Sequence, residues 1–261
     1  MTTPELFHFP VSHYNEKVRW ALDFKRWPHR RTALVAGFHI PRTRWLTGQN
    51  RLPVLVLEGR ALHDSTAIIA ELERLRPEPA LYPSSASDRA RALALEDHFD
   101  EQVAPDLRRL FWSTYIDDTH ECARLATDGF RPFTQWLWRT SFPAIRPAFR
   151  WNMGVGPTQV AAARTRLGQH IDRIEAEIGA AGYLVGDRFT IADLTAAAVM
   201  TAILRPPEFP YPLPEPWPAA LVELRESIID RPGCRWVLDI YRRHRGQSQE
   251  VRIDEERGFG A

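Results

Sequence analysis

Apolar and polar positions in the first 76 residues follow two periods, one of two residues and one of about 3.6. Short apolar runs predict four strands, at residues 5–9, 30–34, 54–57 and 61–63. Apolar side chains at helical spacing predict two helices, at residues 13–26 and 65–76. The stretch with Gly37, Pro41 and Gly48 is expected to be irregular. This order of elements predicts a thioredoxin-like α/β domain over residues 1–78.

The second half of the chain has helical periodicity throughout. A linker is expected at residues 79–87, followed by an all-helical domain over 88–245 and a polar tail over 246–261. Helices are predicted at residues 88–116, 159–178, 191–204, 218–229 and 234–244. Pro105 should kink the first of them.

Two segments of the helical half need separate interpretation. The Trp- and Phe-rich segment 130–158 contains several prolines and predicts a helix followed by a long loop. Its aromatic side chains either line a ligand pocket or pack in the core. Thr190 and Asp193 have the spacing of a capping box, and Phe189 with Leu194 would form its hydrophobic staple. We interpret this box as structural.

Composition narrows the possible functions. The 34 basic and 33 acidic residues nearly cancel, which gives no electrostatic reason to expect nucleic acid or an anionic membrane as a partner. Cys122 and Cys234 have no metal-ligand spacing and are expected to be buried apolar side chains rather than reactive thiols. No targeting pattern and no long apolar run are present, so a cytoplasmic protein is expected. No metal is expected either.

Ser12 follows the first predicted strand and begins the next helix. A free thiol has a pKa of about 8.5 and is mostly protonated at neutral pH. A hydroxyl that donates to the sulfur, backed by the amides and dipole of a helix N-terminus, favours the thiolate. Ser12 is placed for this task, although a serine here can equally be a simple N-cap. Tyr14 is a rival hydroxyl.

Leu52 and Pro53 stand where the third strand begins. Proline cannot donate to a strand ladder. If the Leu52–Pro53 bond is cis, the preceding backbone turns outward, and the Leu52 N–H and C=O can pair with an extended peptide ligand.

Asp64 and Ser65 begin the helix at 65–76. Helix-end amides with a serine hydroxyl suit a carboxylate, and Asp64 suits an ammonium group, although capping explains both residues as well. Three further side chains from the neighbouring irregular stretch can hold a second carboxylate: His39, Gln49 and Arg51.

The chain resembles the cytosolic glutathione transferases in four motifs, which occur in the family's order and spacing: Ser12-x-x-x-x-Lys17-Val18-Arg19, Leu52-Pro53-Val54-Leu55, Asp64-Ser65 and Phe189-Thr190-Ile191-Ala192-Asp193. Because no tyrosine stands in the first strand, the chain is most similar to the serine and cysteine types, such as the zeta, theta and omega classes. The resemblance covers residues 5–85 and 183–200, whereas 115–158 and the tail after 245 match nothing in the family.

The resemblance implies a role for each site residue. Ser12 would donate to the sulfur of glutathione, Leu52 would pair with its cysteinyl backbone, and Asp64 with Ser65 would hold the γ-glutamyl group. Omega-like members have cysteine at the position of Ser12, so no mixed disulfide can form here, which argues against a thioltransferase of that design.

The resemblance also implies an electrophile pocket between the two domains. One wall would come from four side chains that share a helical face: Arg108, Phe111, Trp112 and Tyr115. The expected activity is attack of bound glutathione thiolate on a small hydrophobic electrophile, in a homodimeric detoxification enzyme. Isomerisation, dehalogenation, peroxide reduction on the same scaffold, or a non-catalytic binding protein remain alternatives.

Overall fold

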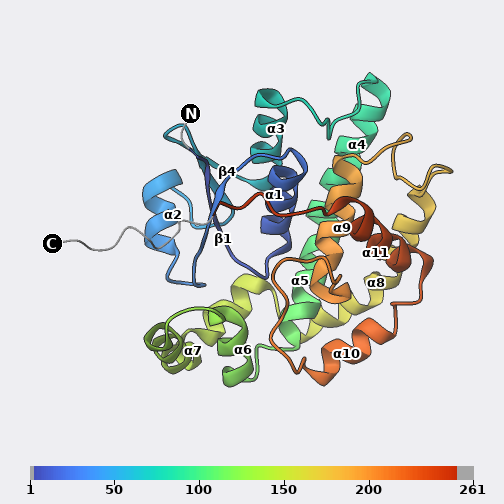
Figure 1. The fold of residues 1–261 in the computed structure, drawn as a ribbon. Helices are drawn as coiled ribbons and strands as arrows, with labels where there is room; N and C mark the ends of the chain where they lie inside the picture. Colours follow the sequence, from blue (N-terminus) through green and yellow to red (C-terminus); the bar gives the residue numbers. More distant parts are fainter. Residues whose placement is uncertain (1–2, 252–261) are drawn as a thin grey trace.

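The computed structural model describes residues 3–251 and consists of an α/β half and a helical half (Figure 1). Four strands form one mixed sheet in the order β2-β1-β3-β4. Their bounds are β1 Glu5–His8, β2 Arg30–Ala33, β3 Val54–Leu57 and β4 Arg60–His63. Strand β1 is parallel to β2 and antiparallel to β3, and β3 pairs with β4 as an antiparallel hairpin. Glu58 and Gly59 join β3 to β4 with φ of 50° and 80°, as a two-residue hairpin turn requires.

Three helices accompany the sheet: α1 His13–Phe24, α2 Ile40–Thr47 and α3 Ser65–Leu75. Helices α1 and α3 pack against each other. The expectation of an irregular stretch before β3 is wrong, because α2 forms there. Pro41 lies in its first turn, and Gly48 ends it with φ of 75°. Both residues suit these positions, since proline is tolerated where amides have no helical partner and glycine adopts positive φ without strain.

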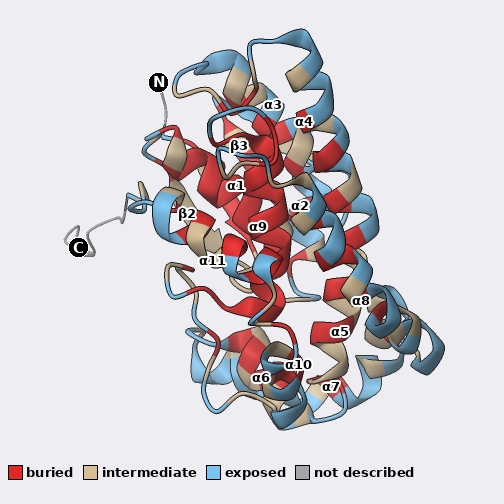
Figure 2. Cartoon of the chain, turned by 90° about the vertical axis from the view of Figure 1, so that its right-hand side faces the viewer, coloured by how far each residue is buried: buried red, intermediate tan, exposed pale blue. Residues whose placement is uncertain are grey.

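The helical half begins with α4 and surrounds one buried helix, α9. Its elements are α4 Ala86–His98, the π-helical turn η1 Phe99–Val103, α5 Ala104–Ser113, α6 Thr119–Thr127, α7 Pro132–Met153, α8 Pro157–Glu177, α9 Ile191–Leu204, α10 Ala219–Glu226 and α11 Pro232–His244. Every residue of α9 is buried, and Figure 2 shows it in the centre of the molecule. Helices α1, α4, α5 and α11 pack around it. A helix that is apolar on all sides needs this environment. The fold prediction is therefore confirmed.

The long helix predicted over 88–116 is interrupted, as Pro105 suggested. Helix α4 ends at His98, and the wider turn η1 joins it to α5, which contains Pro105 in its first turn. Proline has no N–H to continue the ladder of the preceding helix, and the π-helical turn accommodates this loss.

The segment 130–158 contains one long helix rather than a helix with a long loop. Helix α7 continues through Pro143 and Pro147, both of which are exposed. Water can therefore satisfy the carbonyls that these prolines leave without a partner. Trp138 and Phe142 are buried and stack at 4.5 Å. The Trp138 Nε1 donates to the Ala36 carbonyl at 3.0 Å, so α7 is attached to the α/β half.

Residues 245–251 cross back from α11 to the α/β half, and we call this segment the C-terminal strap (Figure 1). The main-chain carbonyl of Gln249 accepts a hydrogen bond from the His29 N–H at 3.1 Å, and the Val251 N–H donates to the His29 carbonyl at 2.8 Å. The strap thus forms a bridge beside the start of β2. The rest of the predicted polar tail lies outside the described residues.

The capping box at the start of α9 is formed. The two Asp193 oxygens accept the main-chain N–H groups of Leu184 and Thr190, each at 2.8 Å. Burial raises the pKa of Asp193 to about 6, although these hydrogen bonds oppose the shift. Thr190 and Asp193 therefore hold the loop before α9 against the start of that helix.

Candidate functional site

Ser12 occupies the N-cap position of α1, directly after the turn that follows β1. Its backbone is extended, with φ of −83° and ψ of 128°, and its side chain makes no capping hydrogen bond. The residue is half-buried. The Ser12 hydroxyl is therefore not used in the way that a simple N-cap would use it, and it remains available at the positive end of α1.

Tyr14, which carries the rival hydroxyl, is hydrogen-bonded to the helical half. Its hydroxyl donates to the Asp100 carbonyl in η1 at 3.1 Å. Burial raises the pKa of Tyr14 to about 12. A phenol that is protonated and already hydrogen-bonded is a weaker candidate for contact with a ligand sulfur than the free hydroxyl of Ser12.

The Leu52–Pro53 peptide bond is cis. Leu52 itself is buried, and within residues 3–251 no hydrogen bond uses its main-chain N–H or C=O. Buried main-chain polar groups are nearly always paired, so the main chain at Leu52 is suited to pair with an extended ligand.

Asp64 and Ser65 lie at the N-terminus of α3. One Asp64 oxygen accepts the Ala67 N–H at 3.0 Å, so the capping interpretation holds for that oxygen, while the other has no partner in the described part of the chain. Asp64 has φ of 71°, which is unusual for a residue other than glycine. Such strain costs roughly 1–3 kcal/mol and is concentrated at ligand sites.

The three side chains expected to hold a second carboxylate differ in availability. The His39 ring accepts from the Gly37 N–H at 3.1 Å and donates to the Asn50 carbonyl at 2.9 Å. Gln49 accepts the Arg51 N–H and donates to the Arg51 carbonyl at 2.9 Å. The Arg51 side chain is exposed, and no ion pair or side-chain hydrogen bond involves it among the described residues. His39 and Gln49 thus shape the loop that presents Arg51.

The four side chains expected on one wall of the electrophile pocket divide into two pairs. Phe111 and Tyr115 are buried and lie 5.1 Å apart between ring centroids, whereas Arg108 and Trp112 are half-buried. Trp112 meets Phe149 of α7 edge to face at 5.0 Å. The segment that matched no family motif therefore packs against this wall.

Arg108 of α5 is a cation that lies close to the start of α1. Arg108 has no carboxylate partner in the described residues, and its Nε has no hydrogen bond. Burial, then Arg108 and Lys17, lower the pKa of His13 to about 3, so that histidine is neutral. Arg51 lies near enough to act electrostatically on Arg108, so two arginines without a carboxylate partner among the described residues lie on this side of the site.

Sequence reasoning missed Arg205, at the end of α9. Its side chain is buried, and its Nε and Nη1 have no partner among the described residues. The Tyr115 hydroxyl is buried and likewise without a partner, and the two side chains interact electrostatically. A charged residue directly after fourteen residues of an apolar helix was the signal in the sequence.

Cys122 and Cys234 are buried, and burial raises the pKa of each thiol to about 12, as expected for structural cysteines. Across residues 3–251, no three His, Cys, Asp or Glu side chains cluster as a metal site would require. In the same residues, none of the helices combines the length and apolarity needed to cross a bilayer.

Comparison with known proteins gives a consistent result. Residues 6–80 match the family model "Glutathione S-transferase, N-terminal domain", and residues 157–222 match "Glutathione S-transferase, C-terminal domain". A probable maleylacetoacetate isomerase 1 from Drosophila melanogaster is 34% identical over 96 residues, a match that spans 34% of this chain and 39% of that relative.

Solved structures share the fold. A glutathione S-transferase from Rhodospirillum rubrum F11 superposes with a TM-score of 0.60 at 23% identity, covering 90% of this chain and 92% of that one. A theta class glutathione S-transferase from Xanthomonas axonopodis pv. citri, with glutathione bound, has a TM-score of 0.57 at 20% identity and covers 95% and 100%. These structures show the shared fold, and the two domain matches, which together span more than half of the chain, show that the chain belongs to the glutathione S-transferase family.

Proposed function

We propose that this protein binds glutathione and activates its thiol for attack on an electrophilic small molecule. The observation that carries the proposal is the Ser12 hydroxyl, which lies at the N-terminus of α1 and makes no capping bond. A solved relative from Xanthomonas axonopodis pv. citri has glutathione bound, which supports glutathione as the ligand.

The tripeptide would be held along the edge of the α/β half. Leu52 would pair with the cysteinyl main chain, because its own N–H and C=O have no partner in the described residues. Ser65, the α3 amides and the free Asp64 oxygen would bind the γ-glutamyl carboxylate and ammonium groups. Arg51 would pair with the other terminal carboxylate, while His39 and Gln49 support its loop.

The thiol would lose its proton to solvent on binding, because the site stabilises the thiolate. Ser12 donates to the sulfur, the α1 dipole adds positive potential, and the unneutralised Arg108 adds more. Each unit of pKa lowering requires about 1.4 kcal/mol of preference for the thiolate. The sulfur then forms a bond to the electrophilic carbon, and the leaving group departs with the bonding electron pair.

A second candidate function is glutathione-dependent isomerisation, in which the same thiolate adds reversibly to the substrate. The relative from Drosophila melanogaster is named as a probable isomerase. Arg205, buried without an acidic partner near Tyr115, favours a substrate that carries an anionic group. In either case we expect a cytoplasmic homodimer without a metal.

The test compares Ser12→Ala with Tyr14→Phe by titrating the bound thiol and measuring conjugation of a chloronitrobenzene. Ser12→Ala should raise the thiol pKa and lower kcat/KM at mildly acidic pH by about 10- to 100-fold, the worth of a hydrogen bond to a charged atom. Tyr14→Phe should leave the thiol pKa in place. If only Tyr14→Phe abolishes turnover, the assignment to Ser12 is wrong. If the wild-type protein fails to bind a glutathione column, the proposed function is wrong.

A further inference from the structure

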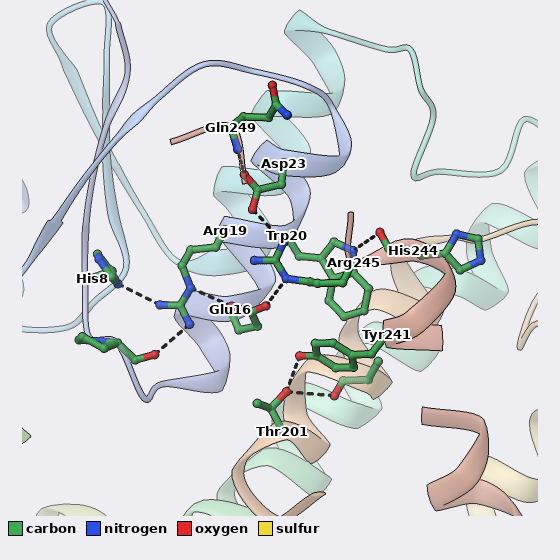
Figure 3. A network of polar contacts seen from close by, with 12 residues as sticks. His8, Glu16, Arg19, Trp20, Asp23, Thr201, Tyr241, His244, Arg245 and Gln249 are labelled. Carbon is green, nitrogen blue, oxygen red and sulfur yellow. Dashed lines mark hydrogen bonds and ion pairs between the residues drawn. The ribbon is translucent and has the colours of Figure 1, made fainter. Parts of the chain in front are cut away.

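One buried guanidinium, that of Arg19, donates to several main-chain carbonyls of the turn that carries Ser12. Figure 3 shows this guanidinium between His8 and Glu16. The Arg19 Nη1 donates to the Phe9 carbonyl at 3.1 Å, and Nη2 donates to the carbonyls of Pro10 at 3.0 Å and Ser12 at 3.4 Å. Nη1 also lies 2.9 Å from the His8 Nδ1. The main-chain bond within the turn, from the Ser12 N–H to the Phe9 carbonyl, is long at 3.3 Å. Arg19 is therefore the main polar support of this turn.

The other edge of the same guanidinium connects to the C-terminal strap. The Arg19 Nε donates to one Glu16 oxygen at 2.8 Å, and the second Glu16 oxygen accepts from the Arg245 Nε at 2.6 Å. The side chains of Arg19, Glu16 and Arg245 are all buried. A continuous series of charge-assisted hydrogen bonds thus leads from the strap to the Ser12 turn.

The strap is fixed on α1 by contacts of its own (Figure 3). Asp23 accepts from the Arg245 Nη1 at 2.8 Å and from the Gln249 N–H at 2.7 Å. The Trp20 Nε1 donates to the His244 carbonyl at 3.0 Å, just before the strap begins. Arg245 is therefore held from two sides while it orients Glu16.

The network carries surplus positive charge behind the start of α1. Three guanidiniums, of Arg19, Arg31 and Arg245, face two carboxylates, of Glu16 and Asp23. Burial lowers the pKa of His29 to about 4 and that of His8 well below its usual value, so both histidines are neutral. The carbonyls of the Ser12 turn balance the surplus, and only a planar fork of donors can reach several of them at once.

We propose that Arg19 is a positioning residue that fixes the Ser12 hydroxyl, and that the C-terminal strap, through Arg245 and Glu16, fixes Arg19. The catalytic consequence rests on the proposed function. The positioning itself concerns the turn alone and can be measured without substrate.

The first test replaces Arg19 by lysine and uses Arg31→Lys as its matched control. Arg31 is equally buried in the same network, pairing with Asp23 at 2.6 Å and His29 at 2.9 Å, but it makes no hydrogen bond to the Ser12 turn. Amide exchange at Phe9, Val11 and Ser12 should accelerate by about 10-fold or more in Arg19→Lys and stay unchanged in Arg31→Lys. Turnover should fall by about 10- to 100-fold in the first variant alone, since misplacement of about 1 Å has this effect.

The second test acts from the strap, where the substitution leaves Arg19 in place. Arg245 pairs with Glu16 through Nε and with Asp23 through Nη1, and Arg245→Lys replaces these two nitrogens by one. It should therefore raise amide exchange in the turn and the pKa of the bound thiol, as Arg19→Lys does, but by less. Equal behaviour of Arg19→Lys and Arg31→Lys, or an Arg245→Lys protein with an unaltered turn, would overturn the proposal. If Ser12→Ala shows that Ser12 has no role in turnover, the exchange comparison still decides whether Arg19 positions the turn.

Discussion

Helix α1 carries two buried polar networks that differ in the sign of their surplus charge. The first, which we call the strap network, joins the carboxylates of Glu16 and Asp23 to the guanidiniums of Arg19, Arg31 and Arg245. The second, which we call the interdomain network, joins Lys17 to two carboxylates of the helical half, Glu96 at 3.1 Å and Asp100. The Thr66 hydroxyl of α3 shares its single proton between the two carboxylates, with Oγ1 at 3.0 Å from Glu96 and 3.2 Å from Asp100. One network thus has too many cations and the other too many anions.

The difference determines how each network responds to protons. In the strap network all oxygens of Glu16 and Asp23 accept an N–H, whereas the Glu96 Oε2 and the Asp100 Oδ1 have no partner in the described part of the chain. Burial raises the pKa of Glu96 despite Lys17. Burial acts in the same direction on Asp23, but Arg245 and Arg31 outweigh it and lower the pKa of Asp23. The strap network is a fixed charge array, and the interdomain network can take up a proton.

The largest expected effect comes from removing one charged partner in each network. Lys17→Met leaves two buried carboxylates close together and should reduce the free energy of unfolding by about 3–5 kcal/mol at about pH 8. Part of this loss should be recovered at about pH 5, because one carboxyl takes up a proton. Denaturant unfolding at both pH values measures the effect.

Glu16→Gln is the matched substitution in the strap network. It leaves the guanidiniums of Arg19 and Arg245 facing a neutral amide. Because guanidiniums do not lose their proton in proteins, the loss of stability should be the same at both pH values. An equal pH dependence for Lys17→Met and Glu16→Gln would contradict the contrast between the networks.

A smaller effect should appear in the wild-type dependence of stability on pH. The pKa of Glu96 is higher in the folded protein than in the unfolded chain. Its contribution to the free energy of unfolding is therefore complete below the unfolded pKa of about 4.3 and is lost as the pH rises through the folded pKa. The lowered pKa of Asp23 has the opposite consequence. Its contribution to the free energy of unfolding is present above the unfolded pKa of about 3.9 and is lost as the pH falls through the folded pKa. Glu96→Gln should therefore flatten the neutral side of the profile and Asp23→Asn the acidic side. If Glu96→Gln flattened the acidic side and Asp23→Asn the neutral side, the directions of the two pKa shifts would be wrong.

The smallest expected effect on stability comes from removing the Thr66 hydroxyl, which Glu96 and Asp100 share. Thr66→Val removes the donor to both carboxylates and should reduce the free energy of unfolding by about 1 kcal/mol, more at neutral than at acidic pH. Thr43→Val is a suitable control, because the Thr43 hydroxyl donates only to main-chain carbonyls of its own helix turn. A larger pH dependence in the control than in Thr66→Val would argue against a role for Thr66 in the interdomain network.

Local signals in the sequence predicted much of the fold. Each strand is found close to its predicted range, and the box at Thr190 and Asp193 forms as its spacing indicates. These features depend on residues within a few positions of one another. Helix α2 was missed although Pro41 and Gly48 are well placed at its two ends, because both residues also suit loops.

The candidate site was only partly predictable, for a related reason. Ser12, Leu52 and Asp64 belong to short motifs whose order along the chain indicated a ligand site. Whether the Ser12 hydroxyl is free, and whether Tyr14 is already bonded, depends on contacts outside those motifs. Arg205 has no motif at all.

The sequence by itself determined the order of elements, the helix start at Ser12 and the family of the chain, because periodicity and short motifs act over a few residues. Only the tertiary structure decided that Tyr14 bonds to Asp100, that Lys17 meets Glu96, and that Arg245 reaches Glu16. These partners are separated by tens to hundreds of residues, and their pairing follows from how the two halves pack. Buried charges must find partners in that packed arrangement, and no local pattern states which partner will be near.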